Sequence, residues 1–179
     1  NAAKIYPAAK RRNWNNFFRL SATLTEPIDV PVLRAALDVT VRRFPSMAVR
    51  LRRGVFWYYL EEIPQAPDIQ PEKSCPLAHV PFGRVRRCAF RVLVYHNRVA
   101  VEFFHAVTDG TGGLIFLKTL VAEYLCQKYG ITVPAEKGVL GRLEEPSPQE
   151  LEDSFLRYAG DVTASRAEST AYHLSGTPD

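Results

Sequence analysis

Residues 86–129 limit the folds open to this chain more strongly than any other segment. Two β-prone runs, about 88–95 and 99–105, are separated by His96-Asn97-Arg98, and a helical apolar pattern over 111–129 follows them. Asn97 tolerates the left-handed backbone that a tight turn needs, so the two runs are predicted to form an antiparallel hairpin. A hairpin followed at once by a deeply packed helix indicates a sheet with a helix on one face.

The remaining segments extend this pattern. Their predicted order is a strand (14–24), a helix (29–44), a hairpin (47–60), an irregular segment (61–83), the hairpin and helix above, and a short helix (148–159). Asp29 and Pro31 favour a helix start, Pro45 ends that helix, and five prolines disfavour regular structure in 61–83. The fold class we expect is α+β: a two-layer sandwich whose mixed, mostly antiparallel sheet carries helices on one face.

Composition excludes several classes of protein. With 179 residues, of which 46% are hydrophobic, the chain can bury one domain-sized core, and no apolar run is long enough to span a membrane. A net charge of +4 permits an anionic partner but does not indicate nucleic acid. The three cysteines form no CxxC pair, which argues against a zinc site and favours the reducing cytoplasm.

One cluster of residues has the composition of a reactive site. His105 ends the predicted strand, Asp109 follows four residues later, and Gly110, Gly112 and Gly113 come before the helix. A neutral imidazole can act as a base near neutral pH, and the glycines leave room for a ligand beside the backbone. Two alternatives stay open: a histidine that is simply packed, and an Asp-Gly pair that only shapes a turn. A metal site is not expected, because a convincing third ligand is lacking.

Residues 104–110, Phe-His-Ala-Val-Thr-Asp-Gly, resemble the His-His-x-x-x-Asp-Gly motif of the chloramphenicol acetyltransferase-like superfamily, which includes alcohol acetyltransferases and nonribosomal condensation domains. Arg43-Phe44-Pro45 resembles the family's exit from its first helix, and 171–178 resembles its crossover to a second half. The resemblance covers only the N-terminal half of a member. It implies that 1–160 is an acyltransferase half domain and that 161–179 is a linker toward a missing C-terminal half.

The resemblance also implies roles for single residues. His105 would be the general base that takes a proton from a hydroxyl or amine acceptor, which then attacks an acyl thioester. Asp109 would be a structural carboxylate paired with an arginine, for which Arg19 is the expected partner, and Gly110 would be the turn residue of the motif. The acyl donor would be acyl-CoA or a carrier-protein thioester, bound as a co-substrate, with no permanently bound cofactor.

Two departures from the family pattern matter. Phe104 stands where many members have a first histidine, which argues against a typical condensation domain. The missing half would supply much of the coenzyme A contact, so we expect the isolated chain to be inactive and to self-associate through its open apolar face. A non-catalytic docking module of the same fold and a fragment of a nonribosomal peptide condensation domain remain alternatives.

Charged clusters elsewhere are expected to lie at the surface. Arg84, Arg86, Arg87 and Arg91 form a basic group that is either a solvated face or an attractor of phosphates or of an acidic carrier protein. The arginines at 42–53 have the same two interpretations. Glu61-Glu62 is expected in a loop.

Overall fold

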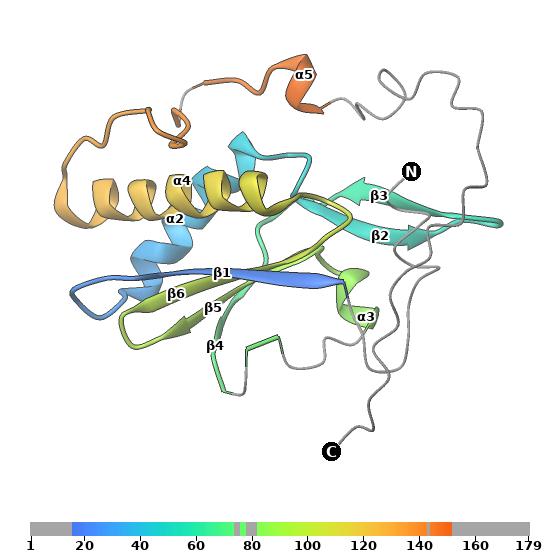
Figure 1. The fold of residues 1–179 in the computed structure, drawn as a ribbon, viewed down its shortest axis with the longest axis horizontal. Coiled ribbons are helices and arrows are strands. Elements are labelled where there is room, and N and C mark those ends of the chain that lie inside the picture. The colour runs from blue at the N-terminus through green and yellow to red at the C-terminus, as the bar shows by residue number, and fades with distance from the viewer. Residues whose placement is uncertain (1–15, 74–75, 78–81, 143, 152–179) are drawn as a thin grey trace, which may run out of the picture.

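The computed structural model describes residues 16–73, 76–77, 82–142 and 144–151. Four strands form one sheet in the order β1 (Phe17–Thr23), β6 (Arg98–Phe104), β5 (Phe90–Tyr95) and β4 (Ile69–Pro71). All its pairings are antiparallel except that of β4 with β5. Two long helices, α2 (Val30–Arg43) and α4 (Gly110–Tyr129), cover one face of this sheet (Figure 1). This is the expected α+β two-layer arrangement.

A second, two-stranded ribbon lies outside the main sheet. β2 (Val49–Arg53) pairs with β3 (Tyr58–Glu62), and the ribbon projects beyond the sheet in Figure 1. Two short helices complete the described residues: α3 (Phe82–Val85) and α5 (Pro148–Leu151). The remainder of the predicted 148–159 helix, and the predicted linker, lie outside the described residues.

The ends of the long helices follow from local chemistry. The Asp29 side chain accepts a hydrogen bond from the Val32 amide at 3.2 Å, and proline occupies the first turn of α2. The α4 helix ends at Gly130, which adopts the left-handed conformation with φ 66°. Glycine commonly ends a helix in this way. Both helix predictions are therefore confirmed, along with their capping residues.

An aromatic cluster joins the helices to the sheet. The Phe116 ring of α4 packs edge-on against Phe44 (5.1 Å between centroids), Phe90 (5.2 Å) and Phe103 (5.4 Å), and both Phe103 and Phe116 are fully buried. Edge-to-face rings at these separations stabilise a core beyond the area that they bury. This cluster fixes α4 on β5 and β6, and so fixes the segment between β6 and α4.

Three predictions of local structure are corrected. The segment 61–83 is not wholly irregular, because β4 and the start of α3 lie in it. Glu61 and Glu62 belong to β3, where the Glu61 carboxylate pairs with Arg50 and Arg52. In the β5–β6 turn it is His96, not Asn97, that adopts positive φ (48°), while the Asn97 amide donates to the Leu24 carbonyl at 2.6 Å.

Candidate functional site

The candidate site lies where β6 ends and the turn toward α4 begins. His105 directly follows β6, and its backbone amide donates to the carbonyl of Asn16 at 2.7 Å, so the backbone there is tied to the start of β1. The His105 side chain is exposed, and its ring lies 5.0 Å from that of Phe18. Phe18 itself stacks on the buried Phe103 at 5.5 Å. The accessible imidazole therefore packs on one side against Phe18, which the buried Phe103 holds in place.

Asp109 acts as the N-cap of α4. Its carboxylate accepts a hydrogen bond from the Gly112 amide at 2.8 Å, and its carbonyl accepts from the Gly113 amide at 3.0 Å. A carboxylate here satisfies orphan amides and is favoured by the helix dipole. Asp109 thus ties the turn after His105 to the first turn of the helix.

The glycines of this turn serve packing more than ligand binding. A Cβ on Gly113 would lie 3.0 Å from the Phe18 ring and 3.2 Å from the Leu20 side chain, and one on Gly112 would collide with the Thr108 hydroxyl. The missing side chain of Gly113 lets α4 approach β1 closely, and that of Gly112 leaves room for Thr108. Only at Gly110 would an added Cβ meet open space. The space expected for a ligand beside Gly112 and Gly113 is therefore occupied by protein atoms.

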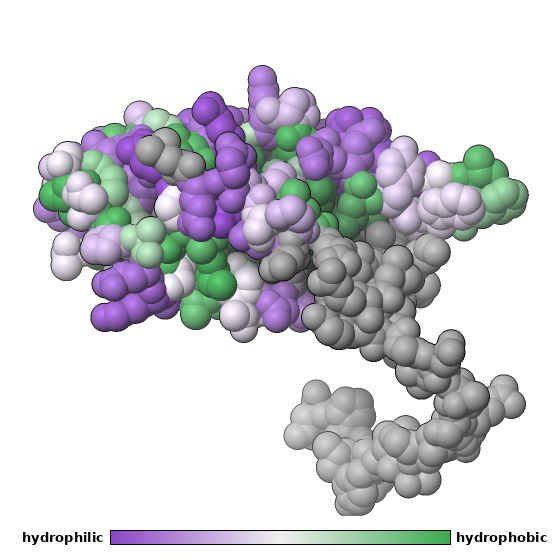
Figure 2. All heavy atoms as spheres, turned by 90° about the horizontal axis from the view of Figure 1, so that it is seen from above, coloured by the Kyte–Doolittle hydropathy of each residue, from purple (hydrophilic) through white to green (hydrophobic). Residues whose placement is uncertain are grey.

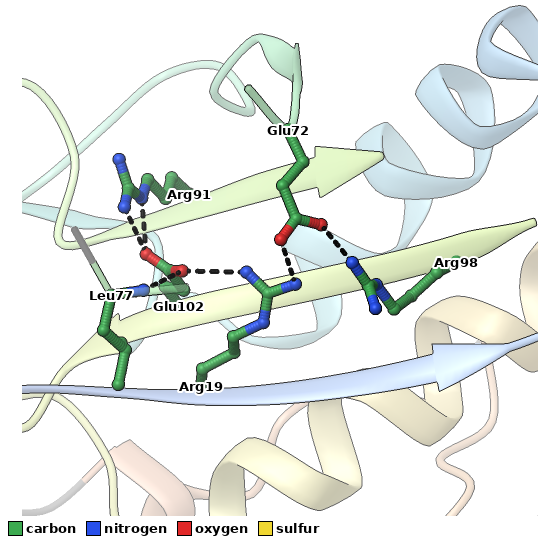
Figure 3. A network of polar contacts seen from close by, with 6 residues as sticks. All are labelled: Arg19, Glu72, Leu77, Arg91, Arg98 and Glu102. Carbon is green, nitrogen blue, oxygen red and sulfur yellow. Dashed lines mark hydrogen bonds and ion pairs between the residues drawn. The ribbon is translucent and has the colours of Figure 1, made fainter. Parts of the chain in front are cut away.

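The expected pairing of Arg19 with Asp109 is replaced by a different network. The Arg19 guanidinium lies 2.8 Å from Glu72 and 3.1 Å from Glu102 (Figure 3). Glu102 is fully buried and also pairs with Arg91 at 2.5 Å. Arg19 therefore crosslinks β1, β6 and the segment after β4, and does not hold the loop that carries Asp109.

This network lies on the sheet face opposite the long helices. Burial raises the pKa of Glu72, but hydrogen bonds from Arg19 and Arg98 outweigh that effect and leave the pKa below its ordinary value. The amide of Leu77 adds a hydrogen bond to Glu102 at 3.2 Å. We did not predict this cluster. Its signal in the sequence was a glutamate within the otherwise apolar run 99–104, opposite two arginines on the neighbouring strands in the observed register.

Other reactive side chains do not join the candidate site. Burial raises the pKa of the Cys88 thiol to about 11, so this cysteine is a poor nucleophile at neutral pH. Within the described residues, no group of three or more acidic, histidine or cysteine side chains could hold a metal ion. His79, Cys75 and His173 lie outside the described residues.

Comparison with known proteins identifies the fold. No family model and no curated protein matches the chain. Among solved structures, the SgcC5 protein from Streptomyces globisporus matches 66% of this chain with a TM-score of 0.53 and 19% identity, covering 32% of its own length. VibH, a nonribosomal peptide synthetase condensation enzyme, matches 73% of this chain (TM-score 0.50, 20% identity), with 34% of its own length covered.

A third match is a variant of the starter condensation domain of rhizomide synthetase RzmA in complex with C8-CoA. It covers 68% of this chain and 32% of its own length, with a TM-score of 0.51 and 13% identity. This chain has the chloramphenicol acetyltransferase-like fold. It spans about a third of the length of these three structures. In the part of the chain that the structure describes, no helix is both long and apolar enough to cross a membrane.

Proposed function

We propose that this chain is part of an acyltransferase that moves an acyl group from a thioester to a hydroxyl or an amine. The observation that carries the proposal is the exposed His105 imidazole, placed at the end of β6 and backed by Phe18. Reactive groups are commonly presented where a rigid strand meets a loop. The fold shared with condensation enzymes supports the same class of reaction.

The chemistry needs one general base. The neutral His105 imidazole takes the proton from the acceptor O–H or N–H as the acceptor attacks the thioester carbonyl carbon. The tetrahedral intermediate then collapses, the carbon–sulfur bond breaks, and the leaving thiolate takes the proton back from the imidazolium. Base assistance of this kind contributes about 10²- to 10⁴-fold in rate. No covalent acyl-enzyme is required, which agrees with the unreactive Cys88.

Asp109 is a positioning residue in this proposal. Its carboxylate caps α4 and does not need to touch the substrate. By holding the turn that begins at His105, it limits the directions in which the imidazole can point. Gly110 gives the chain its entry into the helix at the same place.

Acyl-CoA is the donor that we propose, as a co-substrate and not as a resident cofactor. The RzmA neighbour was solved with C8-CoA, so this fold accommodates such a donor in that protein. We assign the reaction to the cytoplasm, where Cys88 and Cys126 would stay reduced as the free thiols that they are here. A C-terminal half of the same enzyme would complete the substrate channel.

A second candidate is amide formation by a nonribosomal peptide condensation domain, with a carrier-protein thioester as donor. The likeness to VibH favours it, because VibH is a condensation enzyme. The acceptor separates the two candidates. Turnover with small alcohols supports the first, whereas turnover with amines and a carrier-bound donor supports the second.

The test compares two histidine variants in the protein at its natural full length. We expect His105→Ala to lower kcat by about 10²- to 10⁴-fold, because the general base is lost. His96→Asn is the matched control: His96 is also exposed but lies at the opposite end of β6, and asparagine tolerates its positive φ. Circular dichroism checks that both variants fold.

Turnover of His105→Ala at the level of the unmodified protein would exclude His105 as the base. A full-length protein that is inactive toward alcohols and amines alike would favour the non-catalytic docking module. We also expect the 179-residue chain alone to show no turnover.

A further inference from the structure

A basic hollow lies at the end of the sheet where the β2–β3 ribbon begins. Its volume is about 410 Å³, and it lies between the start of β1, the start of β5, the segment 63–70 and the residues that follow α3. Its lining includes five arginines and one carboxylate: Arg34, Arg50, Arg84, Arg87, Arg91 and Asp68. A cavity of this size is in the range of small-molecule sites.

Three of the five arginines already have carboxylate partners within the protein. Arg34 donates to two backbone carbonyls of the segment 66–67 and pairs with two aspartates. Arg50 and Arg91 each pair with a glutamate on a neighbouring strand. These three arginines therefore form part of the wall of the hollow and are not free to bind an anion.

The other two arginines have no carboxylate partner among the described residues. Arg84 donates only to the neutral amide oxygen of Gln70, at 2.5 Å. The Arg87 amide donates a hydrogen bond to the Arg84 carbonyl at 2.8 Å, which places the two residues at the two ends of one turn. Both are exposed. Like charges three residues apart on a turn repel each other, so an anion between them would relieve that repulsion.

We propose that this hollow binds the phosphate group of a small phosphate ester, with Arg84 and Arg87 as its charged ligands. A planar guanidinium matches phosphate in a bidentate geometry, and each such bond is charge-assisted. Two guanidinium groups without carboxylate partners favour a ligand with more than one negative charge, so a phosphate group fits this hollow better than a ligand with a single carboxylate. Gln70 offers an amide at the same wall.

The hollow and the candidate site lie at the same end of the sheet. Phe17 lines the hollow, and its partner in the β1–β6 register is Phe104, the residue before His105. A phosphorylated acyl donor held in the hollow would therefore be anchored near the proposed base. That assignment of the phosphate to an acyl donor rests on the proposed function, whereas phosphate binding itself does not.

The experiment measures binding to the purified 179-residue chain by isothermal titration calorimetry, with inorganic pyrophosphate, coenzyme A and phosphate-free pantetheine as probes. We expect pyrophosphate and coenzyme A to bind and pantetheine not to bind. Arg84→Gln/Arg87→Gln should weaken both by about tenfold or more, since each charged contact typically contributes at least a factor of ten. Tighter binding of coenzyme A than of pyrophosphate identifies an ester as the preferred ligand.

The matched control is Arg53→Gln/Arg86→Gln, which removes the same charge from two exposed arginines that do not line the hollow. It should change affinity by less than about threefold, because screened charges outside a site contribute little. Equal weakening in both double variants, or none in either, would overturn the proposal in favour of general surface attraction.

Two further variants keep the outcome clear. If the double variant loses its circular dichroism signal, the single variant Arg87→Gln decides, because the Arg87 side chain makes no hydrogen bond or ion pair with the described residues. His105→Ala should bind pyrophosphate like the unmodified chain. In the full-length protein, loss of turnover in His105→Ala without loss of binding would concern the base alone. Loss of binding in Arg84→Gln/Arg87→Gln without loss of turnover would contradict only the assignment of the phosphate to the acyl donor.

Discussion

Asp109 and Asp29 cap the two long helices in the same way, but only Asp109 follows His105. Each carboxylate accepts a hydrogen bond from the amide three residues later, at 2.8 Å for Asp109 and 3.2 Å for Asp29. This pair allows the contribution of a cap to stability to be separated from any contribution to the reaction.

We expect Asp109→Ala and Asp29→Ala each to lower the free energy of unfolding by about 0.5–2 kcal/mol, the usual effect of losing an N-cap. Only Asp109→Ala should also lower kcat in the full-length protein, because it loosens the turn that positions His105. Asp109→Asn should restore most of both properties, since asparagine caps helices as well as aspartate does. Denaturant unfolding and steady-state kinetics measure the two effects.

The positioning role would be refuted if Asp29→Ala lowered kcat as much as Asp109→Ala did. It would also be refuted if Asp109→Asn capped the helix but stayed as slow as the alanine variant. That second result would show that the negative charge itself, and not the cap, acts on His105.

The strands of the main sheet are joined by ion pairs between side chains as well as by backbone hydrogen bonds. Glu72 lies beyond β4 and receives hydrogen bonds from Arg19 of β1 and Arg98 of β6 (Figure 3). Its carboxylate is only 8% exposed, so removing its charge leaves Arg98 without a carboxylate partner among the described residues and leaves Arg19 with Glu102 alone. These ion pairs help to attach the segment after β4 to the sheet, together with the hydrogen bond from the Glu72 amide to the Val94 carbonyl at 2.9 Å.

Because the pKa of Glu72 is lowered in the folded chain, its ion pairs stabilise the fold above the unfolded-state pKa near 4.5. The unfolded chain binds the extra proton as the pH falls, so this stabilisation decreases from about pH 5 down through the folded pKa. Glu72→Gln should lower the free energy of unfolding at pH 7 by about 1–3 kcal/mol. Its stability should fall less between pH 5 and pH 3 than that of the unmodified chain.

Unfolding curves at several pH values measure both effects. Glu136→Gln is the control, since Glu136 is exposed and has no ion pair in the described residues. An unchanged pH dependence in Glu72→Gln would contradict the assignment.

The elements that the sequence predicts well are those with local signals. The α2 helix has its cap and proline, α4 has Gly130, and the β5–β6 hairpin has alternating apolar positions. By contrast, β4 lies in a proline-rich segment and pairs in parallel with a strand that comes later in the chain. Such a pairing leaves no nearby turn signal, and Pro71 fits only because it is the last residue of an edge strand.

In the candidate site, too, only the features that depend on neighbouring residues could be predicted. The place of His105 and Asp109 between strand and helix follows from adjacent residues. The partners of Arg19 could not be predicted in that way, because Glu72 and Glu102 are brought to it by the sheet register and not by sequence proximity. The hollow lined by Arg84 and Arg87 likewise depends on segments from five parts of the chain.

The molecule as a unit has an apolar end. Figure 2 shows hydrophobic residues gathered at the end of the molecule where the β2–β3 ribbon projects. The residues of the ribbon turn are among the most exposed apolar side chains described: Val55 is 86% exposed, Phe56 87% and Trp57 57%. We had expected self-association through the face that bears His105, but the ribbon turn presents larger exposed apolar side chains. Exposed patches of this kind promote association between copies.

We therefore expect the purified chain to self-associate as its concentration rises. The double variant Phe56→Ser/Trp57→Ser should weaken that association by about tenfold or more, because burying two aromatic side chains contributes several kcal/mol. The backbone hydrogen bond from Gly54 to the Trp57 carbonyl, at 2.7 Å, does not depend on either side chain, so the ribbon should keep its turn. Val30→Ser/Leu114→Ser is the matched control, because these side chains are 42% and 43% exposed on the helices. Sedimentation velocity across a concentration series measures the effect. If the control variant dissociates instead and the ribbon variant does not, association runs through the helical layer, and the open face beside α4 is the surface that a second half would cover.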